Sequence, residues 1–152
     1  MSTVMEREDV LVQEITIEAS AERIFRALTD PAELLRWWAV EGKFRTLVAD
    51  CDVRPGGAWW MQVEGNCAGG PPIHTVRGIY LVVDPPKRLE YTWLREGEDF
   101  PESTVRWDLE EKDGQTTARV THSGLISDAM KQRNNGWSQV VQLLRGWVEK
   151  RG

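Results

Sequence analysis

Residues 83–93 read VDPPKRLEYTW, a turn sequence that leads directly into a strand-like alternation. The turn, residues 84–87 (DPPK), consists of residue types that interrupt strands and favour tight turns. After it, the apolar residues Leu89, Tyr91 and Trp93 alternate with polar ones. Because successive side chains of a strand point to opposite faces, this pattern predicts a strand that buries its aromatic side chains on one face.

The same alternation extends on both sides of this stretch, from Phe44 to Ser123. Turn and loop sequences interrupt it at intervals typical of antiparallel strands, including RPGG (54–57), NCAGGPP (66–72) and KDG (112–114). Residues 11–19 alternate in the same way and predict a further strand near the start of the chain. The sequence therefore predicts an antiparallel sheet of about six to seven strands.

Two short helices are expected between the first strand and the rest of the sheet. Ser20 can cap the first helix, and Asp30-Pro31 can begin the second, because Asp is a good N-cap and Pro suits the first helical position. Trp37 and Trp38 fall near the end of the second helix, which we expect to end by Gly42.

Residues 128–152 predict a single long helix. Apolar residues recur at helical spacing on one of its faces: Met130, Trp137, Val140, Val141, Leu144 and Val148. One helix cannot cover the whole inner face of a curved sheet of this width. The inward aromatic side chains are therefore expected to meet the long helix, the pair of short helices, or a cavity.

Tryptophan occurs eight times in the 152 residues, more often than phenylalanine or tyrosine. Each indole covers a wide flat surface and carries a single N–H donor. Alternation places Trp59, Trp93 and Trp107 on the inner face of the sheet, opposite Trp137 of the helix. Two interpretations stay open at this point: a solid aromatic core, or the walls of an interior that is not completely filled.

The composition is that of an ordinary globular protein, and the length suits a single domain. A formal net charge of −5 without a run of Lys or Arg argues against a nucleic-acid partner. The polar segment Met1–Val10 does not resemble a signal peptide, and no segment approaches the roughly 18 apolar residues of a membrane span. We expect a cytoplasmic protein without a membrane partner.

Seven segments of the sequence form a recognisable series: ASAERIFRALTDPAELLRWW (19–38), DVRPGG (52–57), GIY (78–80), VDPPKRLEYTW (83–93), TVRWDLE (104–110), THSGL (121–125) and GWS (136–138). In this order along the chain, they resemble the activator of Hsp90 ATPase homologue-like family of the START-like (SRPBCC) superfamily. The resemblance implies one α+β domain over residues 10–150 with a helix-grip fold, in which a curved antiparallel sheet wraps around a long C-terminal helix. It also implies a hydrophobic cavity between the sheet and that helix, which the superfamily uses to bind lipids, sterols, polyketides and plant hormones.

From the alternation and the resemblance together we predict that a small hydrophobic or aromatic ligand binds in a Trp-lined cavity. The predicted ligand-binding residues are Trp37, Trp38, Trp59, Met61, Val63, Tyr91, Trp93, Trp107, Val120, His122, Trp137 and Val141. No catalytic residue and no cofactor is predicted. No metal site is predicted either, because the two cysteines and two histidines match no known ligand spacing.

Two polar residues have alternative interpretations. Alternation places the His122 side chain on the inner face of the sheet. One interpretation is that it acts as a hydrogen-bond donor or general base in the cavity. The other, which we favour, is a structural His that forms a hydrogen bond with a backbone carbonyl. An inward Arg77 could hold a ligand carboxylate, whereas an outward one is a solvated charge, which we favour. The adjacent Gly78 leaves the register open, since it could mark a bulge.

Two other functions are kept as alternatives. The first is an enzyme of the cyclase or dehydratase type that uses the same cavity with His122 or Arg77, although we lean against catalysis. The second is a protein-interaction module, chaperone-associated or regulatory. Because Trp60 alternates with the inward set and lies beside polar neighbours, we expect it on the outer face, as the site of a homodimer or partner contact.

Overall fold

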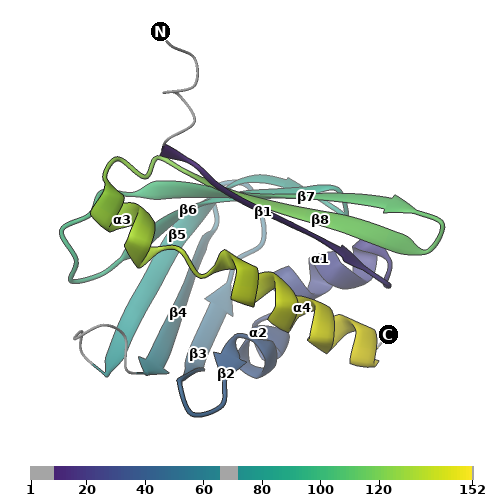
Figure 1. The fold of residues 1–152 in the computed structure, drawn as a ribbon, viewed down its shortest axis with the longest axis horizontal. Coiled ribbons are helices and arrows are strands. Elements are labelled where there is room, and N and C mark those ends of the chain that lie inside the picture. The colour runs from purple at the N-terminus through teal and green to yellow at the C-terminus, as the bar shows by residue number, and fades with distance from the viewer. Residues whose placement is uncertain (1–8, 66–71, 152) are drawn as a thin grey trace, which may run out of the picture.

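A computed structural model describes residues 9–65 and 72–151 of the chain. These residues form one curled antiparallel sheet that wraps around a C-terminal helix, with two short helices at its open side (Figure 1). The α+β helix-grip fold predicted from the sequence is therefore confirmed. Most of the predicted loop at residues 66–72 lies outside the described residues.

The sheet of the described residues has eight strands rather than six to seven. Their order in the sheet is β1-β8-β7-β6-β5-β4-β3-β2. The unexpected strand is the two-residue β2, which pairs Val40 with Phe44 and is too short to produce an alternation. The bounds are β1 Leu11–Ile17, β2 Ala39–Val40, β3 Phe44–Cys51, β4 Ala58–Gly65, β5 Ile73–Asp84, β6 Arg88–Arg95, β7 Ser103–Lys112 and β8 Gln115–Ser123.

Both predicted helix starts are confirmed by their caps. The Ser20 hydroxyl accepts the Arg23 N–H at the start of α1 (Ala21–Thr29). The Asp30 carboxylate accepts the Ala32 N–H at 2.9 Å at the start of α2 (Pro31–Trp37). Since α2 ends at Trp37, the following Trp38 leaves the helix axis and enters the interior from the linker to β2.

The predicted single C-terminal helix is wrong, because the structure divides it into α3 (Asp128–Arg133) and α4 (Trp137–Arg151). The break falls at Asn134, Asn135 and Gly136, three residues with low helix propensity. The Met130 carbonyl accepts both the Asn134 side-chain amide at 2.8 Å and the Asn134 backbone N–H at 3.2 Å, so Asn134 caps the end of α3. A local side-chain bond of this kind gives no signal in the apolar periodicity.

Gly78 does not mark a bulge, since the register shift between β5 and β6 lies between Tyr80 and Val82. Instead, Gly78 allows two neighbours to approach the backbone. A Cβ at this position would overlap the Thr92 carbonyl oxygen and lie 2.7 Å from Trp59 Nε1. The Thr92 hydroxyl takes over a ladder bond here, because it accepts the Ile79 N–H at 2.8 Å.

The core lies between the inner face of the sheet and helices α1, α2 and α4. Its centre is the indole of Trp93 on β6. The Trp93 ring centroid lies 5.6 Å from that of Trp59, 5.8 Å from that of Trp137 and 6.2 Å from that of Trp38. Tilted and edge-to-face contacts of this kind stabilise aromatic clusters beyond their burial alone.

Candidate ligand-binding site

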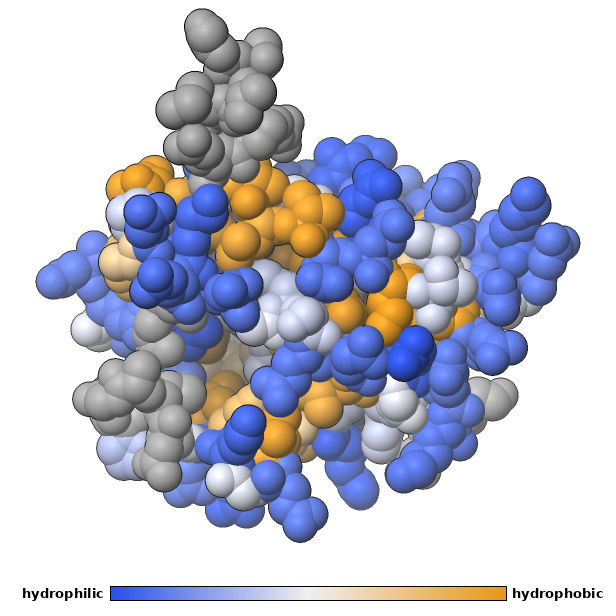
Figure 2. All heavy atoms as spheres, in the orientation of Figure 1, coloured by the Kyte–Doolittle hydropathy of each residue, from blue (hydrophilic) through white to orange (hydrophobic). Residues whose placement is uncertain are grey.

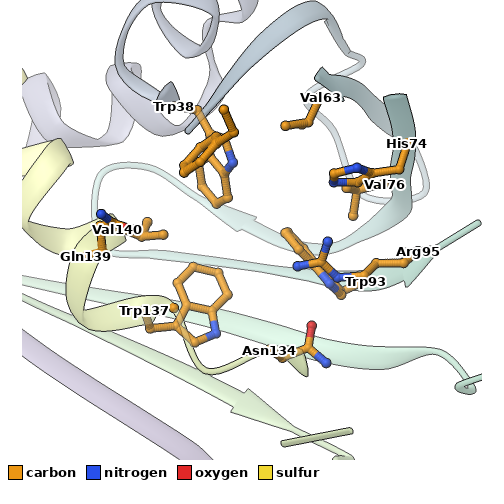
Figure 3. Close-up of a pocket in the computed structure, with 12 residues that line it drawn as sticks. Trp38, Val63, His74, Val76, Trp93, Arg95, Asn134, Trp137, Gln139 and Val140 are labelled. Carbon is orange, nitrogen blue, oxygen red and sulfur yellow. The ribbon is translucent and has the colours of Figure 1, made fainter. Parts of the chain in front are cut away.

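A cavity of about 150 Å³ lies beside this aromatic cluster, between the start of α4 and strands β4 to β6 (Figure 3). We call it the main cavity. Its walls combine the indoles of Trp38, Trp93 and Trp137 with aliphatic side chains and a few polar groups. The full set of lining residues is Trp38, Phe44, Val63, His74, Val76, Trp93, Arg95, Asn134, Gly136, Trp137, Gln139 and Val140.

A second space of about 30 Å³, here called the inner void, lies deeper, between the helix pair and strands β3 to β6. Trp38 and Trp93 border both spaces, and their ring centroids are 6.2 Å apart. Trp38 is half-buried, whereas Trp93 is buried. The two indoles therefore form the partition between the main cavity and the inner void.

The predicted ligand-binding residues divide into three groups. Trp38, Val63, Trp93 and Trp137 line the main cavity. Trp37, Trp59, Met61 and Tyr91 line the inner void, together with Trp38 and Trp93. Trp107, Val120, His122 and Val141 line neither space and are fully buried in the core.

Trp37 joins the two short helices to each other. Its indole N–H donates to the Ala27 carbonyl at 2.9 Å, which joins α2 to α1. Trp37 is buried, and it touches only the inner void. Of the two adjacent tryptophans, Trp38 is thus the one that borders the main cavity.

Four polar residues of the main cavity were missed: His74, Arg95, Asn134 and Gln139. Two of them were visible in the alternation, because Arg95 is in phase with Trp93 and His74 is in phase with the buried Val76. Asn134 and Gln139 gave no comparable signal. Their positions depend on the break between α3 and α4, which the periodicity did not predict.

Arg95 brings positive charge to the cavity. Its guanidinium carbon lies 5.7 Å from the centroid of the Trp93 ring, a cation–π distance. Figure 3 shows this guanidinium beside the Trp93 indole, with His74 on the same side of the cavity. The ends of β5 and β6 therefore place His74 and Arg95 on one side of the main cavity, whereas Asn134 and Gln139 come from the region where α3 ends and α4 begins.

His122 has the structural role that we favoured, but with different partners. The Trp137 indole N–H donates to His122 Nδ1 at 3.0 Å. The ring proton must then lie on Nε2, which donates to the Ser103 hydroxyl at 2.7 Å. Burial, aided by the charge of Arg95, lowers the pKa of His122 to about 4. His122 is therefore neutral near pH 7 and fixes the indole of Trp137 in the cavity wall.

Arg77 lies on the outer face of the sheet, as favoured, and its Nε donates to Glu96 at 2.8 Å. Trp60 also lies on the outer face, in register between Asp50 of β3 and Arg77 of β5. It is half-buried rather than fully exposed. Neither residue reaches the main cavity.

Among the described residues, no helix is long and apolar enough to cross a membrane. No protein of curated function matches the sequence closely enough for comparison.

Similar folds occur among crystal and solution structures of bacterial proteins. A protein from Chromobacterium violaceum superposes with a TM-score of 0.79 at 28% identity, over 93% of this chain and 97% of that one. A protein from Mycobacterium smegmatis gives 0.78 at 21% identity, over 93% and 89% of the two chains. An AHSA1-like protein from Aeromonas hydrophila gives 0.72 at 21% identity, over 93% and 94%.

The family model described as "Activator of Hsp90 ATPase homolog 1-like protein" matches residues 18–149. This range begins just before α1 and ends within α4, so it includes the helix pair, strands β2 to β8 and every residue that lines the main cavity. The chain belongs to the activator of Hsp90 ATPase homolog 1-like family.

Proposed function

We propose that the protein binds a small hydrophobic or aromatic ligand in the main cavity. The observation that carries this proposal is a space of about 150 Å³ bordered by three indoles. An apolar cavity of about this volume is large enough to hold benzene. The rings of Trp38, Trp93 and Trp137 lie 5.8 to 6.2 Å apart, so they offer several flat faces to a planar ligand.

Access to the cavity supports this proposal. Gly136 and Gln139, at the start of α4, line the cavity and are exposed. The same face of the molecule is hollowed below the segment that joins α3 to α4 (Figure 2). A ligand can therefore approach from solvent beside the start of α4, past the half-buried Val140.

Tryptophan fluorescence, excited at the red edge of the indole band, tests the proposal with benzene, toluene and naphthalene. We expect a saturable change in the tryptophan emission with the single-ring compounds and a matching rise in the thermal midpoint. Val140→Phe fills the entrance and should weaken binding at least about tenfold, whereas Val53→Phe, at an exposed valine outside the cavity, should not. Absence of saturable binding by the whole panel would overturn the proposal.

A reaction of the cyclase or dehydratase type finds no support in the two residues first considered for it. His122 is buried outside the cavity with both ring nitrogens engaged, and Arg77 faces outward. A catalytic use of the cavity would have to rest on His74 and Arg95 instead. Ligand binding needs no such group, and we therefore place it first.

The contact with a second copy or another protein at Trp60 stays a separate proposal. Ile79 is 40% exposed and Val48 is 38% exposed on the same outer face, beside the half-buried Trp60. Sedimentation of the wild type and of Trp60→Ala over a range of concentrations tests whether this face joins two copies. A cytoplasmic location likewise stays a prediction from the sequence, and cell fractionation tests it.

A further inference from the structure

Two buried polar atoms at the main cavity carry an inference about the ligand itself. Among the described residues, neither Trp93 Nε1 nor Asn134 Oδ1 has a hydrogen-bond partner. Trp93 is 5% exposed and Asn134 is 7% exposed. Buried polar groups in native proteins are nearly always paired, and leaving one unpaired costs about 1–3 kcal/mol. Each of these atoms therefore calls for a partner supplied from the cavity.

The hydrogen-bonding roles of the two atoms are opposite. An indole nitrogen can only donate. The Asn134 amide is oriented by its other end, since Nδ2 donates to the Met130 carbonyl at 2.8 Å. Its oxygen is consequently the free end, and it can only accept. In Figure 3 this oxygen points from the break before α4 toward Trp93 and Arg95.

A hydroxyl is the smallest group that both accepts a hydrogen bond and donates one. The volume of the cavity, about 150 Å³, matches one aromatic ring rather than a fused system. We propose that the ligand of the main cavity is a small phenol, an inference that rests on the binding function proposed above. Its ring lies among the indoles, and its hydroxyl lies between Trp93 Nε1 and Asn134 Oδ1.

A carboxylate fits the same polar side less well, although Arg95 is close by. Ionised carboxylate oxygens only accept, so one of them would face the Asn134 oxygen without a proton between the two. The Arg95 guanidinium is itself engaged with the Trp93 ring at a cation–π distance of 5.7 Å.

The test compares phenol with toluene, in which a methyl group replaces the hydroxyl at nearly the same size. Calorimetric titration of the wild type at pH 7 gives both affinities. Toluene is the more hydrophobic of the two, so a cavity that offers only apolar contacts binds it more tightly. We expect phenol to bind at least as tightly as toluene. We also expect phenol to shift the indole N–H resonance of Trp93 further downfield than toluene does, because only phenol adds a hydrogen-bond acceptor to this N–H.

Two variants remove the proposed partners one at a time. Asn134→Leu removes the acceptor and Trp93→Phe removes the donor. Each should lower the affinity for phenol relative to toluene by about fivefold or more, as expected for one lost hydrogen bond. Asn135→Leu is the matched control for the first, because Asn135 is exposed and adjacent. Trp60→Phe is the control for the second, because Trp60 lies on the outer face of the sheet and lines neither the main cavity nor the inner void.

The possible results separate this inference from the proposed function. Suppose that both toluene and phenol bind, that toluene binds much more tightly, and that this preference is the same in both variants. This result would overturn the phenol assignment and would mean that water occupies the polar position. The proposed ligand-binding function would stand. Tighter binding of benzoate than of phenol would also overturn it, in favour of an anion at Arg95. Absence of binding by all three compounds would overturn the binding function itself. Because either variant can lower stability, thermal midpoints of both are measured first, and the NMR shift in the wild type gives an independent readout.

Discussion

The imidazole of His122 is held between β7 and α4 by hydrogen bonds at both of its ring nitrogens. Its inward position was predictable from the alternation of β8, and the structure confirms it. Its partners come from β7 and α4, so no local pattern could name them. A neutral imidazole that accepts from Trp137 and donates to Ser103 has no free nitrogen for acid–base work. Its effect on the cavity is indirect, since it holds the Trp137 indole in place.

The depressed pKa of His122 predicts a loss of stability in mild acid. Protonation of the unfolded chain occurs near pH 6.5, the ordinary value for His, whereas in the fold the pKa lies at about 4. The contribution of the neutral His122 side chain to the free energy of unfolding is therefore complete above pH 6.5, and it falls as the pH drops toward 4. The total loss is about 3 kcal/mol, with the unfolded state binding up to one more proton. Urea unfolding at several pH values measures this slope.

His122→Gln is the comparison for that experiment, because glutamine does not titrate and can still form hydrogen bonds. Between pH 6.5 and 4, the slope of the free energy of unfolding against pH should be smaller in this variant, by the equivalent of about one bound proton. An unchanged slope would contradict the assignment to His122. If the variant does not fold, an NMR titration of the two histidine rings of the wild type supplies the answer, since His122 should stay neutral down to about pH 4.

At the scale of elements, the sequence predicted features that depend on neighbours along the chain. The caps at Ser20 and Asp30 and the hairpin turn at Asp113-Gly114 are of this kind, and the structure contains all three. The turn residues both have positive φ, 56° and 81°, as a two-residue type I′ turn requires. The break before α4 was missed, because the apolar periodicity runs through it from Met130 to Trp137. Asn135 and Gly136 were the available signal, but isolated weak helix formers occur inside many helices.

Two glycines of similar appearance in sequence should respond in opposite ways to alanine. Gly146 lies within α4, and an added Cβ would meet nothing within 4 Å. Gly146→Ala should therefore raise the free energy of unfolding by about 0.5–1 kcal/mol, through helix propensity and a less flexible unfolded chain. Gly78→Ala should destabilise the protein, because its Cβ would overlap the Thr92 carbonyl oxygen. Chemical denaturation of both variants checks the two signs, and a stable Gly78→Ala protein would contradict the close approach.

Glu33 joins three helices through one carboxylate. It accepts from Arg23 of α1 at 2.8 Å and from the Trp147 indole of α4 at 2.7 Å, while it lies in the first turn of α2. Burial raises the pKa of Glu33, but the hydrogen bonds from Trp147 and Arg23 and the nearby positive charges outweigh it, so the net pKa is lowered. The helix pair and α4 are therefore held together at one point by the Glu33 carboxylate.

Glu33→Gln should lower the free energy of unfolding by about 1–3 kcal/mol at pH 7, since it leaves a partly buried Arg23 without its ion pair. The sign of the pH effect follows from the lowered pKa. The carboxylate stabilises the fold above the ordinary glutamate pKa, and this contribution is lost as the pH falls through the folded value. The difference between wild type and variant should thus shrink in acid. Glu22→Gln, at an exposed position in the first turn of α1, is the control and should change little.

For the whole molecule, alternation could identify the inner face of the sheet but not the places where that face is left uncovered. Trp107 and Trp93 are equally inward, yet only Trp93 borders open space. The difference is set by where α4 begins and by how Trp38 leaves α2. Both depend on packing between elements that are distant in sequence. The polar residues Arg95 and His74 could have been found by continuing the alternation by one step at each strand end.

The partition formed by Trp38 leads to a prediction about ligand size. Trp38 and Trp93 separate a space of about 150 Å³ from one of about 30 Å³, and Trp38 is the half-buried member of the pair. Trp38→Ala removes an indole from this partition, so the two spaces should become continuous. We expect the variant to bind naphthalene at least about tenfold more tightly than the wild type, with little gain for toluene, which already fits. Trp60→Ala, which removes a half-buried indole from the outer face, controls for general loss of stability. Equal naphthalene affinities of wild type and Trp38→Ala would contradict this prediction. Trp38 would then not limit the size of the ligand, and the limit would have to come from the strands and α4 instead.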